Sequence, residues 1–196
     1  MSSDAAANAY EIRPDPQDLT TDKGPFTPSS DQGHPEVDYE PYPEKSVPLS
    51  PEQEKIVKAI TSLYSGSASR EDMEVYAQEA IYDDPWSYCD TRYKIAGQWY
   101  GIPKIFSLSR TRATQILVAS PTEIIYKQKQ EYTPKSSPTG KAVNSLVSLS
   151  LDEQGKVKYH KDMWNKKDYS HEGLGKWMKK LNGDHLTKIT QPEKDL

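Results

Sequence analysis

The amino-acid sequence predicts one α+β domain that follows an acidic, proline-rich segment. Helical apolar spacing dominates residues 50–82, extended segments follow from residue 114 onward, and residues 1–48 show no apolar periodicity. At 196 residues and 34% hydrophobic content, the chain can build one packed domain and a solvated segment. We therefore expect a disordered tail at 1–48, the folded domain at 49–185 and a polar C-terminal tail at 186–196.

The N-terminal segment is defined by its prolines and its charge. It has ten acidic and three basic residues, a net charge of −7, which leaves +3 for the rest of a chain whose formal net charge is −4. Such a segment buries too little apolar surface to offset the entropy of ordering. It could hold to its own domain by charge, recruit a partner or only add solubility. Tyr39 and Tyr42 could also dock in extended form into a groove.

Two capped helices are predicted at the start of the domain. Ser50-Pro51-Glu52-Gln53 is a capping box with proline at the first helical position. The apolar stripe that follows it is Ile56, Ala59, Ile60, Leu63 and Tyr64. A second cap at Ser69 precedes residues with the same spacing, which are Met73, Tyr76, Ala77, Ala80 and Ile81. This spacing predicts a second helix that ends near Asp84-Pro85.

Extended segments make up the second half of the domain. After a polar loop at 87–98, which could serve as a lid, a short helix is expected around 103–108. The β-branched and aromatic segments are 114–119, 124–132, 142–151 and 157–165, with turn residues at 134–140 and 152–155. They predict consecutive antiparallel hairpins in one curved sheet. Apolar spacing between Leu174 and Leu181 predicts a short closing helix.

The order of elements and three segments resemble the nuclear transport factor two-like (NTF2-like) superfamily, in particular its SnoaL-like branch. The segments are Ala80 to Pro85, Gly101 to Phe106, and Lys158-Tyr-His-Lys-Asp-Met-Trp-Asn165. The resemblance covers about residues 50–168. It implies a cone-shaped domain with N-terminal helices packed in a curved antiparallel sheet, a cavity open at one end and a homodimer packed through the sheet. The superfamily includes polyketide cyclases, ketosteroid isomerase, scytalone dehydratase and protein-binding transport factors, so the fold alone assigns no activity.

Candidate chemistry lies on the last predicted strand. Because side chains alternate along a strand, His160, Asp162 and Trp164 share one face. If that face lines a cavity, His160 and Asp162 can exchange protons with an organic substrate. The alternative is a hydrogen-bonded pair on a solvated face, with Trp164 in the core.

A second group of candidates lies near the expected cavity mouth. Asp84 is either a further acid/base group or a turn residue before proline. Tyr82, Trp86 and Trp99, together with Trp164, either line a pocket for an apolar ligand or pack in the core and at its rim.

Several functional classes are disfavoured by the sequence. Cys89, the single cysteine, excludes an intrachain disulfide and is expected to be a small buried side chain. The four histidines lack metal-ligand spacing, and no phosphate-binding or serine-hydrolase motif is found. We expect no metal, no cofactor, no nucleic acid and no membrane partner, and a cytoplasmic or nuclear location.

Two functions from different classes follow from these observations. The first is a small-molecule pocket protein, of the kind that acts as a cofactor-independent lyase or isomerase on an apolar organic substrate. The second is a non-catalytic protein-interaction module that dimerises through its sheet. The first predicts a deep cavity lined by the residues named above, and the second predicts a filled cone and an exposed apolar patch.

Overall fold

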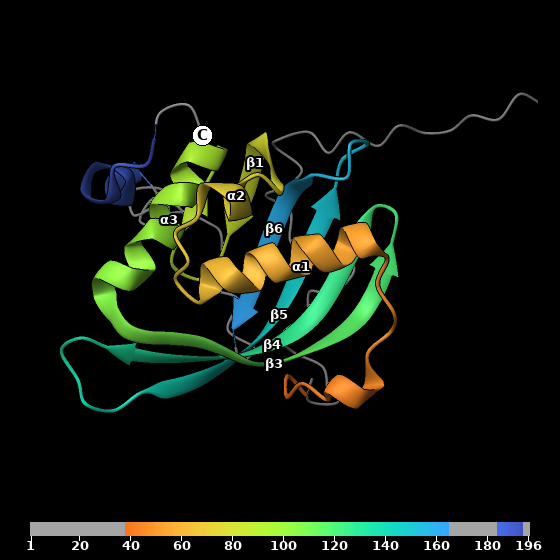
Figure 1. Ribbon diagram of the computed structural model, residues 1–196, viewed down its shortest axis with the longest axis horizontal. Helices are drawn as coiled ribbons and strands as arrows, with labels where there is room; N and C mark the ends of the chain where they lie inside the picture. The colour runs from red at the N-terminus through yellow and green to blue at the C-terminus, as the bar shows by residue number, and fades with distance from the viewer. Residues whose placement is uncertain (1–37, 165–183, 194–196) are drawn as a thin grey trace, which may run out of the picture. The chain divides into compact units, whose positions relative to one another are not determined.

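A mixed six-stranded sheet with α-helices on one face forms the domain (Figure 1). The computed structural model describes residues 38–164 and 184–193. The helices are η2 (Pro43–Lys45), α1 (Pro51–Tyr64), α2 (Arg70–Met73), α3 (Arg92–Ile105) and a C-terminal segment, 184–190. The strands are β1 (Tyr76–Asp83), β2 (Tyr88–Cys89), β3 (Phe106–Ser120), β4 (Glu123–Pro134), β5 (Lys141–Leu151) and β6 (Val157–Trp164). Their order in the sheet is β2-β1-β6-β5-β4-β3.

Helix α1 begins where the sequence predicts. The side chain of Ser50 accepts a hydrogen bond from the backbone of Gln53, whose side chain in turn accepts one from the backbone N–H of Ser50. The predicted stripe is buried, and α1 lies across the sheet with that stripe toward the strands (Figure 1). The helix ends at Tyr64, whose side chain is buried in the core.

The second predicted helix is wrong beyond its first turn. Ser69 caps α2 as expected, but α2 ends at Met73 and the chain continues as β1. Tyr76, Ala80 and Tyr82 are buried with a spacing of four and two residues, which fits a strand. The pair Tyr76 and Ala80 also fits helical i, i+4 spacing, so the sequence pattern was ambiguous. Strand β1 pairs parallel with β6, and the sheet is therefore mixed and not wholly antiparallel.

The segment between β2 and β3 also differs from the prediction. Much of the expected polar loop is helical, because α3 begins at Arg92, with Thr91 as its cap, and buries Ile95 and Trp99. Pro103 lies inside its last turn, and β3 starts immediately after the helix, where a short helix was expected. The predicted closing helix at 174–181 lies outside the described residues.

The C-terminal helical segment contacts α3 where glycine allows a close approach. A Cβ atom at Gly97 would lie 2.8 Å from the Thr187 Cγ2 atom and 3.1 Å from its backbone nitrogen. Thr187 and Thr190 are buried. Residues 186–190, which the sequence places in a polar tail, are helical in the structure.

The four predicted strands of the second half are confirmed as β3 to β6 in consecutive antiparallel pairs. The register aligns Ile116 with Tyr126, Tyr126 with Val147, and Val147 with Asp162. These side chains are buried and face the helices. The inner face of the sheet therefore carries both the apolar core and Asp162.

Residues 38–48 lie on the outer face of the sheet, opposite α1, although their composition placed them in the tail (Figure 1). We call them the strap. Tyr39 is buried against Ile125 and Leu146. Glu40 bonds Lys129 at 2.6 Å. Of the roles considered for the N-terminal segment, residues 38–48 therefore show attachment to their own domain, through the apolar anchor Tyr39 as well as through charge.

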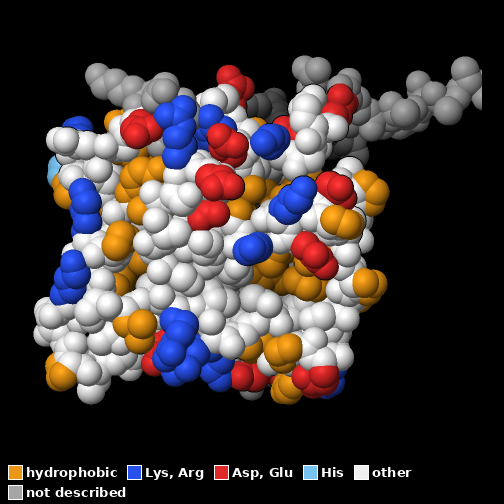
Figure 2. Space-filling view, in the orientation of Figure 1, with side chains coloured by type: hydrophobic (Ala, Val, Ile, Leu, Met, Phe, Trp, Pro, Cys, Tyr) orange, Lys and Arg blue, Asp and Glu red, His pale blue; other side chains and the backbone are white. Residues whose placement is uncertain are grey.

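Charged side chains of both signs are interspersed over the face shown in Figure 2. None of the helices in the described ranges has the length and apolar character that a membrane crossing requires.

Candidate functional site

A cavity of about 440 Å³ opens between α3, the end of α1 and one end of the sheet. Half of the fourteen described lining residues are aromatic: Tyr64, Tyr82, Trp86, Trp99, Phe106, Tyr132 and Trp164. The others are Asp84, Ser87, Gln98, Ile102, Ile105, Val143 and Leu186. Its volume and apolar lining are those of small-molecule sites. The rim is exposed, since Trp86 is 57% and Ile105 is 51% accessible to solvent.

Asp84 is the only carboxylate among the described lining residues. It follows β1 directly and organises the turn to β2, because its Oδ1 atom accepts hydrogen bonds from the backbone N–H groups of Trp86 (2.7 Å) and Ser87 (2.5 Å). Its Oδ2 atom accepts a bond of 2.7 Å from the Tyr82 hydroxyl. Asp84 is thus a turn residue, as one of the two interpretations predicts, and its side chain also lines the cavity.

Burial raises the pKa of Asp84 from 3.8 to about 6, against the lowering effect of its bonds from Tyr82 and the turn. The charge of the nearby Asp162 contributes to the same rise. A carboxyl whose pKa is near neutrality can both accept and donate a proton at physiological pH. Asp84 therefore places a carboxyl with a pKa near neutrality in the wall of the cavity.

Asp162 lies behind the cavity wall. Its Oδ2 atom accepts hydrogen bonds from the Tyr64 hydroxyl at 2.6 Å and from the Trp164 Nε1–H group at 2.8 Å. Burial raises the pKa of Asp162, while these donors lower it. Both donors line the cavity and Asp162 does not, so Asp162 fixes the orientation of two wall side chains.

His160 is fully buried and reaches Asp162 only through Tyr64. Its Nδ1 atom lies 2.7 Å from the Tyr76 hydroxyl and its Nε2 atom 3.3 Å from the Tyr64 hydroxyl. A neutral ring with its proton on Nε2 satisfies both contacts while Tyr64 donates to Asp162. Burial lowers the pKa of His160 to about 3, which keeps the ring neutral. Trp164 lines the cavity, whereas His160 does not. The solvated-face alternative for these residues is wrong.

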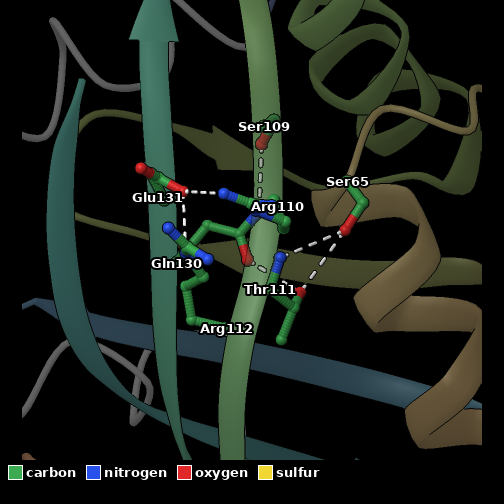
Figure 3. A network of polar contacts seen from close by, with 7 residues as sticks. All are labelled: Ser65, Ser109, Arg110, Thr111, Arg112, Gln130 and Glu131. Carbon is green, nitrogen blue, oxygen red and sulfur yellow. Dashed lines mark hydrogen bonds and ion pairs between the residues drawn. The ribbon is translucent and has the colours of Figure 1, made fainter. Parts of the chain in front are cut away.

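A polar network lies at the end of α1, and Figure 3 shows its members Ser65, Ser109, Thr111 and Gln130. The carbonyl oxygen of Tyr64 accepts hydrogen bonds from the Ser109 hydroxyl (2.5 Å) and the Gln130 amide (3.0 Å). Thr111 donates to the Gln130 side chain at 2.7 Å and contacts the Ser65 hydroxyl at 3.4 Å. The network joins α1, β3 and β4, and it thereby positions the Tyr64 hydroxyl above Asp162.

All four aromatic candidates from the sequence line the cavity: Tyr82, Trp86, Trp99 and Trp164. The sequence pattern did not mark the other lining residues, among them Tyr64, Gln98, Phe106 and Tyr132. Tyr64 was assigned only to the apolar stripe of α1, although a tyrosine at the last position of a buried helix carries a hydroxyl that needs a partner. No such signal marked the other three.

The described lining residues include no Lys, Arg or His. Within the described ranges, no three His, Cys, Asp or Glu side chains are close enough to hold a metal ion. Cys89 is buried, as predicted, and burial raises the pKa of its thiol, so the thiolate is disfavoured. Among the described lining side chains, Asp84 is the one whose pKa lies near neutrality.

No protein-family model and no curated protein matches the sequence. Among solved structures, an NTF2-like protein from Anabaena variabilis is 6% identical, with a TM-score of 0.50 over 61% of this chain and 89% of that chain. A hypothetical ketosteroid isomerase-like protein from Catenulispora acidiphila, in complex with trimethylamine, is 16% identical (TM-score 0.49; 55% and 82% covered). A putative isomerase of the SnoaL-like family from Agrobacterium tumefaciens is 14% identical (TM-score 0.48; 59% and 98% covered). The fold is NTF2-like, as the sequence resemblance predicted.

Proposed function

We propose that this protein binds a small, largely apolar organic molecule in the aromatic cavity and transfers protons to or from it without a cofactor. The observation that carries the proposal is one cavity of about 440 Å³ that combines aromatic walls with a buried, hydrogen-bonded carboxyl. Small-molecule sites are typically clefts of a few hundred Å³ with mostly apolar walls and a few polar groups. A cavity of this size, open at its rim and carrying a carboxyl, therefore supports ligand binding.

Asp84 is the proposed proton acceptor and donor, and Tyr82 is its partner. Asp84 faces the cavity, and its pKa of about 6 allows both protonation states near neutral pH. This is the acid/base chemistry of a lyase or an isomerase. Asp162 and His160 are positioning residues in this proposal, because they do not line the cavity but contact its wall residues: Asp162 accepts from Tyr64 and Trp164, and His160 contacts Tyr64.

The alternative of a sheet-mediated interaction module has less support. It needs an exposed apolar patch on the outer face of the sheet. In the structure, Tyr39 of the strap already covers Ile125 and Leu146 on that face. The cavity on the inner face, by contrast, is open at its rim.

The test is a fragment screen by protein-observed NMR on the full chain, with the indole N–H signals of the lining tryptophans as reporters. We expect small aromatic fragments to shift these signals. Val143→Trp, which fills the cavity from β5, should abolish the shifts. Thr114→Trp is the matched control, because it adds the same bulk in a shallow groove beside α1. Equal binding by both variants, or no fragment bound by the wild type, would refute the proposal.

A further inference from the structure

The described walls of the cavity combine seven aromatic side chains and one carboxyl with no basic group. This composition differs from that of a neutral apolar pocket, which needs no buried acid, and from that of an anion site, which supplies Arg, Lys or backbone N–H donors. Besides the tyrosine hydroxyls, Gln98 and Ser87 are the other polar side chains among the described lining residues, and the Ser87 hydroxyl donates to the Gln98 side-chain oxygen at 2.8 Å.

We propose that the ligand is an organic cation, an alkylated amine or quaternary ammonium whose charge lies among the aromatic rings and beside Asp84. This inference rests on the proposed function and specifies its ligand class. Aromatic rings attract cations through their negative faces, and aromatic cages recognise quaternary ammonium groups. A carboxylate in the same cavity adds an opposite charge at low dielectric.

The position of Asp84 supports the same conclusion. Its two oxygens are held by the turn and by Tyr82, so the carboxyl cannot turn away from the cavity to find a partner elsewhere. Asp162 adds a second acidic group behind the wall. An anionic ligand would meet repulsion from Asp84 with no compensating cation among the described lining residues.

The experiment compares three probes of one shape and three charges on the full chain by NMR titration. The cation is benzyltrimethylammonium, the neutral isostere is neopentylbenzene and the anion is phenylmethanesulfonate. We expect the cation to bind about tenfold more tightly than the neutral probe, a difference of about 1.4 kcal/mol. The anion should not bind.

Two substitutions assign the effect to the cavity. Asp84→Asn should weaken cation binding about tenfold and leave the neutral probe unchanged. Asp83→Asn is the matched control, since it removes the same formal charge at the neighbouring position. The Asp83 side chain accepts from the Tyr159 hydroxyl and does not line the cavity. Trp86→Leu at the exposed rim should weaken the cation more than the neutral probe and carries little risk to folding.

The outcomes separate the two proposals. Equal or tighter binding of the neutral probe, or a cation affinity unchanged in Asp84→Asn, overturns the cation assignment and leaves a neutral ligand pocket. Binding of the anion overturns it as well. Failure of all three probes, together with a fragment screen that finds no ligand, overturns both the cation assignment and the proposed function.

Discussion

The two faces of the sheet are filled in different ways. The inner face buries ionisable and polar groups, among them His160 and Asp162, under the helices and still leaves a cavity. The strap covers part of the outer face with one buried tyrosine, Tyr39, and forms the ion pair between Glu40 and Lys129. The same strands carry both faces, because successive side chains along a strand point alternately to one face and the other.

The difference shows which face is organised for stability alone. An apolar anchor over apolar side chains stabilises without burying charge. Buried carboxyls cost free energy unless they are fully paired, and proteins retain such groups chiefly where function needs them. We therefore expect substitutions on the inner face to act through protonation and buried hydrogen bonds, as at a functional site. Substitutions on the outer face should act through ordinary packing.

The largest expected effect comes from Asp84→Asn on the inner face. The folded-state pKa of Asp84, about 6, lies above its ordinary value of 3.8, so its ionisation destabilises the fold as pH rises through this window. The amide can still accept the two turn bonds. The variant should be more stable than wild type by up to about 3 kcal/mol at pH 7.5, and the gain should vanish near pH 4. Urea unfolding at both pH values measures this, and a loss of stability at pH 7.5 would contradict it.

Tyr64→Phe should have the next largest effect. It removes the hydroxyl that donates to Asp162 and contacts His160, so two buried groups lose a partner. We expect a loss of about 2 kcal/mol in the free energy of unfolding. Tyr126→Phe is the matched control, because the Tyr126 hydroxyl is buried without a hydrogen-bond partner among the described residues. Equal losses in both variants would mean that the Tyr64 bonds contribute nothing specific.

Tyr39→Ala tests the outer face. Removing the anchor should release the strap and expose Ile125 and Leu146, at a cost of about 1 to 2 kcal/mol because local release limits the loss. Hydrogen exchange should show faster amide exchange across residues 38–48, and size-exclusion chromatography should show self-association through the uncovered patch. Unchanged exchange in the strap would show that Tyr39 does not hold it.

Glu40→Gln should have the smallest effect. Glu40 pairs with Lys129 and accepts from the Asn144 amide at 2.7 Å, and these partners hold the pKa of Glu40 below its usual value. The contribution of Glu40 to the free energy of unfolding is therefore fully present at pH values above its usual pKa. It is lost as the pH falls through the lowered, folded-state pKa. We expect a loss below about 1 kcal/mol that disappears in concentrated salt. A loss that persists in 1 M salt would contradict an electrostatic origin.

Local signals in the sequence were sufficient for part of the fold. The capping box at Ser50 and the alternation in β5 depend on neighbours within four residues, and both are found in the structure. β1 was misread because Tyr76 and Ala80 satisfy helical and strand spacing alike, and only pairing with β6 decides between them. The start of α3 was missed because a polar stretch with a single threonine cap gives a weak signal.

For the candidate site, too, the sequence indicated some features and only the tertiary structure decided the others. The residue types of the cavity, Asp84 before proline and several tryptophans among them, could be chosen from the sequence alone, as could the shared face of His160 and Asp162. Only the tertiary structure decided that Asp84 lines the cavity and that His160 and Asp162 lie behind wall side chains such as Tyr64. His160 meets Tyr76 and Tyr64 across 84 and 96 residues of chain. Contacts at that separation depend on strand order and register, which no local pattern encodes.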